Sequence, residues 1–154
     1  MKRIAIGCDE AAYELKVTLK KLLEEKGYEV ADYGTHDGKP VLYPDIAYAL
    51  AKDVADDKLD RGVLLCGTGI GVCITANKVP GVRAAQCHDV YSAERARMSN
   101  DAQIICMGAR VIGPELAKTV LSAWLSAEYQ GGRSAEKVDK IREYEARHLR
   151  AQER

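Results

Sequence analysis

The sequence has 154 residues, a length that suits one domain with a sizeable core. Lysine and arginine number 23, as do aspartate and glutamate, so no net charge attracts the chain to nucleic acid or to an anionic membrane surface. Hydrophobic residues make up 47%, which argues against disorder, and no apolar run approaches the roughly eighteen residues of a membrane span.

The first residues and the cysteines bear on the cellular compartment. The apolar run in MKRIAIGCDE is too short for the hydrophobic part of a secretory signal. The five cysteines are an odd set without a CxxC pair, which is typical of a protein kept reduced inside the cell. We therefore expect a cytoplasmic protein, with four of its thiols packed as small core residues: Cys8, Cys73, Cys87 and Cys106.

Short β-like runs alternate with helical patterns along the chain. We predict strands over residues 3–7, 29–33, 62–66, 82–86 and 104–107. Apolar residues between them recur at helical spacing. In chain order these are Leu15, Leu19, Leu22 and Leu23 before Gly27; Ile46, Leu50 and Val54 after YPD; and Leu116, Val120, Leu121, Trp124 and Leu125 after Pro114. The alternation predicts a single domain over residues 1–154, an open five-stranded parallel sheet in a Rossmann-like α/β/α sandwich.

The last segment, RSAEKVDKIREYEARHLRAQER, has the pattern of a polar helix over about residues 134–150. Its apolar stripe is thin, consisting of Val138, Ile141 and Leu149. Such a stripe buries little area alone, so we expect this helix to pack on a second subunit, in a homodimer or a tetramer.

Parallel sheets of this kind bind ligands beyond the carboxyl ends of their strands. Four predicted strands end in loops rich in functional groups, GCDE, CGTGIG, CHD and MGAR. We expect the binding site where these loops converge.

The glycine-rich loop follows the third strand and leads into a helix. Gly67, Gly69 and Gly71 leave backbone N–H groups uncovered, a nest that suits a phosphate or a developing oxyanion. The dinucleotide-binding pattern would need glycine at position 72, where this chain has Val72. A tight turn without function is the plainer alternative.

Cys66 is the last residue of that strand, at the start of the following helix. One interpretation is a small core residue. The other is a catalytic base, because a helix N-terminus stabilises a thiolate, and a thiolate can remove a proton from carbon beside a carbonyl. Of the histidines, His36 and His148 are expected in solvent, His88 either packs in a loop or borders the site, and their spacing predicts no metal site.

Several motifs resemble the ribose-5-phosphate isomerase B and galactose-6-phosphate isomerase family. They are IAIGCDEAAYELK, YPDIA, LLCGTGIGVCITANKVPGVRAA, YSAERAR, MGARVIGPELA and YQGGR, and they run in order from about residue 3 to residue 140. The resemblance implies an enzyme that interconverts aldose and ketose phosphates through a cis-enediolate, without a metal or an organic cofactor.

The resemblance also implies roles for individual residues. Cys66 would move a proton between C1 and C2, and Thr68 would handle a hydroxyl proton. The enediolate oxygens would accept hydrogen bonds from the backbone N–H groups of Gly67, Gly69, Ile70 and Gly71. Asp9 and Asn100 would hold sugar hydroxyls. Tyr43 matches an active-site tyrosine of the family. The phosphate would be bound from the partner subunit by Arg133 and Lys137, with Arg110 a weaker candidate for the same region.

Two positions depart from the usual pattern of the family. Glu10 stands where most ribose-phosphate members have a phosphate-binding histidine. Its carboxylate must turn away, be protonated, or contact a hydroxyl instead. Ser99 stands where members have the histidine that opens the furanose ring as a general acid.

The missing ring-opening acid leaves three explanations open. Another group, such as His88, supplies the proton; ring opening occurs in solution; or the substrate has no ring. A tetrose 4-phosphate cannot form a furanose, because the phosphate blocks its 4-hydroxyl. Erythrulose 4-phosphate therefore competes with ribose 5-phosphate, the default substrate of the family, ahead of hexose 6-phosphates.

Two other classes of protein compete with an isomerase. A catalytically silent sugar-phosphate binder would explain Glu10 and Ser99 as decay, whereas the intact CGTGIG loop and Arg133 favour activity. A nucleotide or nicotinamide enzyme is disfavoured by the broken glycine pattern.

Overall fold

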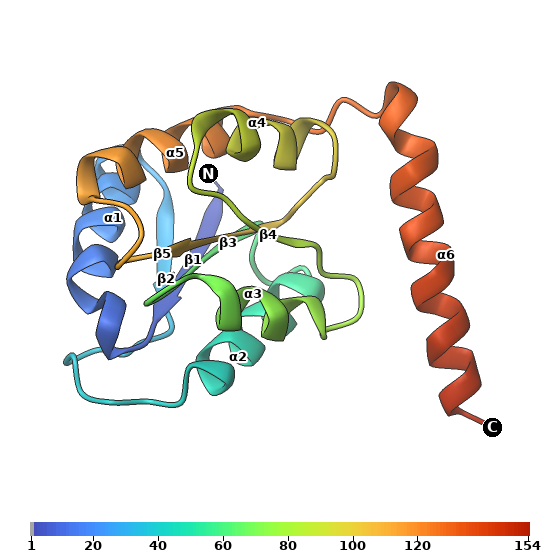
Figure 1. The fold of residues 1–154 in the computed structure, drawn as a ribbon, viewed down its shortest axis with the longest axis horizontal. Coiled ribbons are helices and arrows are strands. Elements are labelled where there is room, and N and C mark those ends of the chain that lie inside the picture. Colours follow the sequence, from blue (N-terminus) through green and yellow to red (C-terminus); the bar gives the residue numbers. More distant parts are fainter. Residues whose placement is uncertain (1) are drawn as a thin grey trace.

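The computed structural model describes residues 2–154, which form one parallel sheet covered by helices (Figure 1). The strands are β1 (Arg3–Cys8), β2 (Glu29–Asp32), β3 (Arg61–Cys66), β4 (Ala84–Gln86) and β5 (Ile104–Gly108), in the spatial order β2-β1-β3-β5-β4. The helices are α1 (Tyr13–Glu25), α2 (Tyr43–Ala55), α3 (Ile70–Asn77), α4 (Val90–Met98), α5 (Pro114–Ser126) and α6 (Ala135–Gln152), with 3-10 turns at Glu10–Ala12 and Gly132–Ser134.

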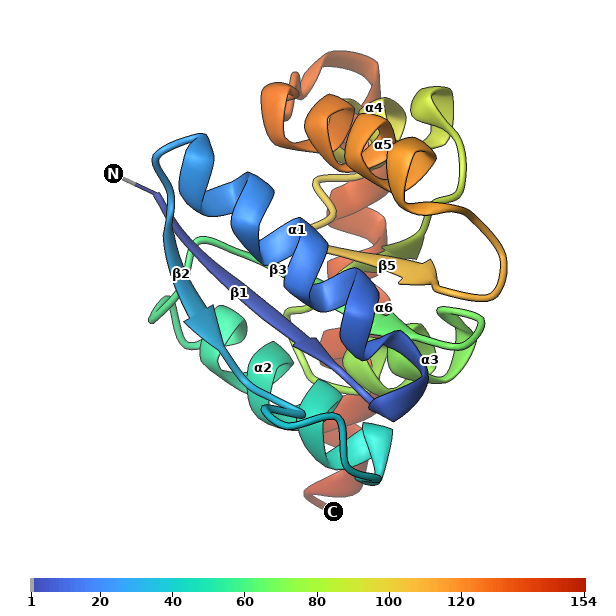
Figure 2. The ribbon, with the colours of Figure 1, turned by 90° about the vertical axis from the view of Figure 1, so that its left-hand side faces the viewer.

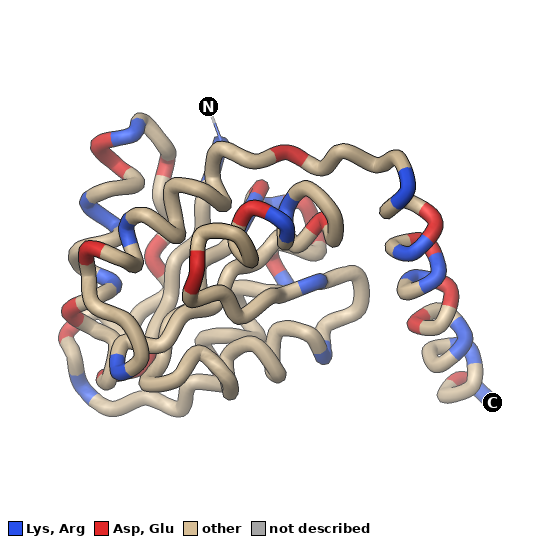
Figure 3. The backbone as a smooth tube through the Cα atoms, turned by 45° about the horizontal axis from the view of Figure 1, so that its top comes forward, with Lys and Arg blue, Asp and Glu red and all other residues tan. Residues whose placement is uncertain are grey.

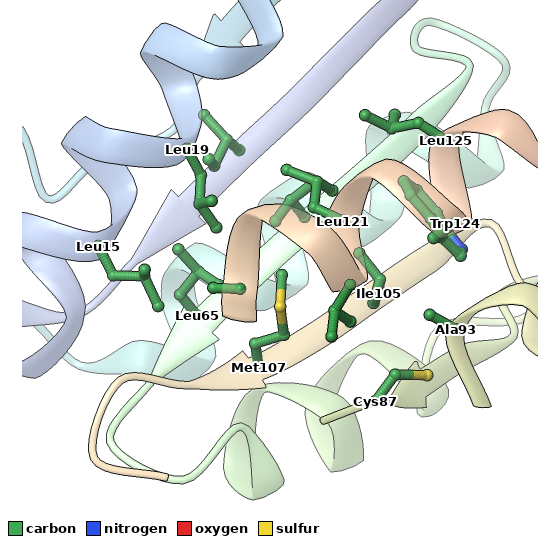
Figure 4. Close-up of a cluster of buried hydrophobic side chains, with 14 of the residues drawn as sticks. Leu15, Leu19, Leu65, Cys87, Ala93, Ile105, Met107, Leu121, Trp124 and Leu125 are labelled. Atoms are coloured by element: carbon green, nitrogen blue, oxygen red, sulfur yellow. The ribbon is translucent and has the colours of Figure 1, made fainter. Parts of the chain in front are cut away.

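Helices cover both faces of the sheet, as expected when strands are apolar on both sides (Figure 2). Helices α1, α4 and α5 pack on one face, against residues such as Leu65 of β3 and Met107 of β5 (Figure 4). Helices α2 and α3 pack on the other face, against Leu64 and Cys106. Successive residues of β3 therefore serve opposite cores, and the predicted α/β/α sandwich is confirmed.

The strand order positions the ligand-binding edge. Strand β1 lies between β2 and β3, so the connections after β1 and β3 diverge and leave a crevice at their carboxyl ends. The N–H of Asp9, just after β1, donates to the carbonyl of Leu65 near the end of β3 at 3.4 Å. The loops that follow these two strands are thereby brought together.

The predicted strand boundaries hold to within two residues. Strand β4 begins at Ala84 rather than at residue 82, because the N–H of Val82 bonds to the carbonyl of Val79 in a turn. The prediction that Leu116 lies on the packed face of α5 is wrong, since its side chain is exposed. The buried face runs through Ala117 and Trp124 instead, which places Leu116 on the outer side.

Helix α6 projects beside the sheet (Figure 1), and charged residues of both signs line it (Figure 3). Only Val138 of its predicted apolar stripe is buried; Ile141 is 49% exposed and Leu149 is 40% exposed. The contacts of α6 with the body include the carboxylate of Glu145, which accepts the N–H of Gly81 at 3.1 Å. No helix within residues 2–154 is both long and apolar enough to cross a membrane.

Candidate active site

The centre of the site is the loop between β3 and α3. Gly69 caps α3 with φ of +77°, and a Cβ there would lie 2.8 Å from the carbonyl carbon of Met107. A Cβ on Gly108 would lie 2.5 Å from the carbonyl carbon of Thr68. The loops after β3 and β5 therefore pack backbone against backbone, and both positions require glycine.

Cys66 lies beneath this loop at the end of β3. Its Sγ accepts the N–H of Gly69 at 3.1 Å, and the residue is 5% exposed. Within residues 2–154, the N–H groups of Gly67, Thr68 and Gly71 have no hydrogen-bond acceptor. A sulfur at a helix N-terminus, beside amides that are free to bind an anion, has the surroundings of a reactive thiolate.

Two longer side chains border the same loop. The ring of Tyr43, at the start of α2, lies against Gly71, where a Cβ would come within 2.4 Å of the phenol oxygen. The guanidinium of Arg110 lies over Gly67, where a Cβ would be 3.3 Å from Nη1. The amide nest is thus flanked by a phenol on one side and a cation on the other.

The two carboxylates after β1 differ in their surroundings. Burial, together with the neighbouring Glu10, raises the pKa of Asp9, against smaller opposite effects of the N–H groups of Ala12 and Ala11 and of Arg110. Asp9 Oδ1 is buried without a hydrogen-bond partner within the described chain, so it is available to a substrate hydroxyl. Glu10 accepts the N–H of Val41 at 3.1 Å, and its own N–H and that of Val41 lower the pKa of Glu10. Glu10 is therefore an ionised carboxylate turned toward the loop before α2.

His88 contacts the loop after β5, which packs on the glycine-rich loop, but it is poorly suited to supply a proton. Its Nε2 accepts the N–H of Gly108 at 2.8 Å, which requires that this nitrogen carry no hydrogen. Burial lowers the pKa of His88, although nearby Asp89 opposes the effect. The geometry favours a neutral imidazole that holds the loop after β5.

Four of the predicted site residues are not near Cys66 within one chain: Ser99, Asn100, Arg133 and Lys137. Asn100 follows α4 at the amino ends of the strands, where its carbonyl accepts Arg83 Nε at 3.1 Å. The span from Ile104 to Gly108, four residue steps of β5, separates the two ends by about 13 Å. Ser99 Oγ accepts two N–H groups of Arg95 instead of facing the site.

Arg133 and Lys137 also lie toward this opposite end. Arg133 lies in the second 3-10 turn and Lys137 in α6. Shortly before them, the N–H of Gln130 donates to the carbonyl of Met98 at the end of α4, which places this part of the chain near the amino ends of the strands.

A hollow of about 290 Å³ lies between β4 and α4 and reaches Asn100. Other hollows, of about 330 and 350 Å³, flank α1 rather than Cys66. Within residues 2–154 no group of three or more His, Cys, Asp or Glu residues could hold a metal ion.

Sequence reasoning missed Gln86, the last residue of β4. Its Nε2 donates to the carbonyl of Thr68 at 2.8 Å, inside the glycine-rich loop. The available signal was its position at the carboxyl end of a strand, directly before the CHD motif.

Comparison with known proteins agrees with this geometry. The family model described as Ribose/Galactose Isomerase matches residues 4–141. The chain is 60% identical to the D-erythrulose-4-phosphate isomerase of Pectobacterium atrosepticum over 94% of this chain and 96% of that protein. It is 57% identical to the ribose-5-P isomerase B of Listeria innocua, over 92% of this chain and 95% of that protein. The structure of Clostridium thermocellum ribose-5-phosphate isomerase B superposes with a TM-score of 0.93 at 46% identity, over 95% of this chain and 99% of that one. The chain therefore belongs to the ribose/galactose isomerase family and is a sugar-phosphate isomerase of the aldose–ketose type.

Proposed function

We propose that this enzyme isomerises a short sugar phosphate through a cis-enediolate, with Cys66 as the base. The observation that carries the proposal is the Cys66 sulfur bound to the N–H of Gly69 at the start of α3. The thiolate removes a proton from the carbon beside the carbonyl, and the resulting thiol returns it to the adjacent carbon. The free N–H groups of Gly67 and Gly71 stabilise the enediolate oxygens, while the N–H of Gly69 holds the sulfur.

The other site residues follow from the same geometry. Thr68 transfers the proton between the two substrate oxygens, and Asp9 holds a sugar hydroxyl. Tyr43 closes the side of the site next to Gly71, whereas the N–H of Ile70, which the resemblance assigns to the enediolate, is bound to Thr68 Oγ1 at 3.2 Å. Arg110 lies over Gly67 and adds positive charge near the substrate.

The residues at the opposite end of the sheet reach the reaction from a second copy of the chain. Arg133 and Lys137 then bind the phosphate, and Asn100 binds a hydroxyl. The exposed Ile141 and Leu149 of α6 give that helix an apolar stripe for the second copy to cover. We therefore propose a homodimer, or a tetramer built from such dimers. The free thiols support a reducing, cytoplasmic location.

The preferred substrate that we propose is D-erythrulose 4-phosphate, converted to erythrose 4-phosphate. This tetrose cannot close a furanose ring, so it needs no ring-opening acid. The hydroxyl of Ser99 is a far weaker acid than the imidazolium it replaces, and His88, whose Nε2 accepts the N–H of Gly108, has a pKa lowered by burial. The name of the Pectobacterium relative agrees with this choice. Ribose 5-phosphate is the second candidate, because the Listeria relative is named for it.

The test uses purified wild-type protein and the Cys66→Ala variant. Turnover is measured by NMR with erythrulose 4-phosphate, ribose 5-phosphate and galactose 6-phosphate at equal concentrations. We expect the highest kcat/KM with the tetrose phosphate, and a loss of at least about 1,000-fold in kcat on replacing Cys66. Substrate binding to Cys66→Ala, followed by calorimetry, should persist.

The substrate, the base and the catalytic activity itself can each be refuted by a different result. A higher kcat/KM for ribose 5-phosphate would refute the tetrose assignment but leave the cysteine base intact. Full turnover by Cys66→Ala would refute the base. Binding without turnover by the wild-type protein would support the silent sugar-phosphate binder.

A further inference from the structure

Gln86 contacts the peptide unit that supports the Cys66 sulfur. The Thr68–Gly69 peptide bond is trans, so its C=O and N–H groups point in opposite directions. Its carbonyl accepts Gln86 Nε2 at 2.8 Å, and its N–H donates to Cys66 Sγ at 3.1 Å. Any rotation of this peptide that breaks one of these hydrogen bonds also misdirects the other.

The packing around this peptide restrains it from a second side. Gly108 lies against the Thr68 carbonyl, where a Cβ would be only 2.6 Å from the oxygen. The N–H of Gly108 donates to His88 Nε2 at 2.8 Å. The end of β4 and the residues after it thus hold the peptide in two ways, directly through Gln86 and indirectly through His88.

We propose that Gln86 is a positioning residue for the reaction: it orients the Thr68–Gly69 peptide so that the Gly69 N–H stabilises the Cys66 thiolate. The inference rests on the proposed role of Cys66 as the base. Gln86 is exposed and need not touch the reacting carbons, because it acts through the peptide. A hydrogen bond to an ionised group is stronger than one to a neutral group, so orienting this donor favours the ionised thiol.

The test replaces Gln86 with leucine, which has a similar size but no N–H donor. Both this variant and its reference carry Cys73→Ser, so that the tryptic peptide over residues 62–78 contains one cysteine. Alkylation of Cys66 by iodoacetamide is followed by mass spectrometry from pH 5 to pH 10, and kcat and KM are measured on the same samples. We expect the alkylation midpoint to move to higher pH and kcat to fall about tenfold at neutral pH, with KM nearly unchanged.

Gln103 provides a matched control. Its Nε2 also donates to a backbone carbonyl at 2.8 Å, that of Gly81, but at the amino ends of the strands. Gln103→Leu should lower thermal stability without moving the alkylation midpoint of Cys66. If Gln86→Leu also leaves that midpoint unchanged, Gln86 does not position the peptide and the proposal is wrong. This outcome differs from failure of the proposed function, which Cys66→Ala reports by retaining turnover.

Discussion

Gly108→Ala tests the packing of the two loops that form the active site. A Cβ at this position would lie 2.5 Å from the carbonyl carbon of Thr68, whereas ordinary van der Waals contact begins at 3.4 Å. The difference requires a movement of about 0.9 Å between the two backbones. Because Thr68 shares its peptide with the N–H of Gly69, that movement misplaces the donor to Cys66. A misplacement of about 1 Å can reduce catalysis about 100-fold, and we expect kcat to fall by that factor.

The assay combines steady-state kinetics on erythrulose 4-phosphate with thermal unfolding. The added methyl group should cost about 1–3 kcal/mol of folding stability, so the variant remains folded at 25 °C. Gly113→Ala is the matched control, since a Cβ there meets nothing within 4 Å, and its kcat should stay within about twofold of wild type. A folded Gly108→Ala enzyme with a kcat close to that of Gly113→Ala would refute the reasoning.

Two further predictions concern ionisable side chains outside the reaction. Hydrogen bonding to Cys106 lowers the pKa of Cys73 to about 7, so its partly buried thiol should alkylate at neutral pH in Cys66→Ala protein. Burial raises the pKa of Cys8 to about 12, and mass spectrometry should find Cys8 unmodified under the same conditions. Lys16, 2% exposed, is paired with a carboxylate, so Lys16→Met should cost about 3 kcal/mol in urea unfolding. The exposed ion pair between Lys21 and Glu25 is weaker, so Lys21→Met should cost at most about 0.5 kcal/mol. Equal losses of unfolding free energy for Lys16→Met and Lys21→Met would contradict this difference.

Most of the fold could be predicted from the sequence because strand and helix periods differ. The strand that ends at Cys66 reads GVLLC after Arg61 and is buried along its whole length, on both faces of the sheet. Leu116 shows the limit of this approach. Helical spacing groups it with the other apolar residues of α5, but the face that packs is chosen by the sheet, and Ala117 occupies it.

The site could be predicted only where it depends on strand ends. Cys66 ends one strand and Asp9 directly follows its parallel neighbour, so their meeting follows from the order of the strands. The sequence places Gln86 at a strand end but does not predict its bond to Thr68, which depends on how far β4 extends along the sheet. The resemblance assigns both Asn100 and Asp9 to sugar hydroxyls, but α4 returns Asn100 to the amino ends of the strands, so the proposed role of Asn100 needs a second copy of the chain.

Reaction type and substrate length depend on different parts of this enzyme. Proton transfer between adjacent carbons needs one base and donors for an oxyanion, and in the proposed mechanism the loop from Cys66 to Gly71 supplies both, whatever the length of the sugar. The departures from the usual family pattern lie elsewhere: Glu10 is held by the amide of Val41, and Ser99 is at the other end of the sheet. Changes at Glu10 or Ser99 should therefore alter which sugar phosphate is selected, while changes around Cys66 should slow the isomerisation of every substrate alike.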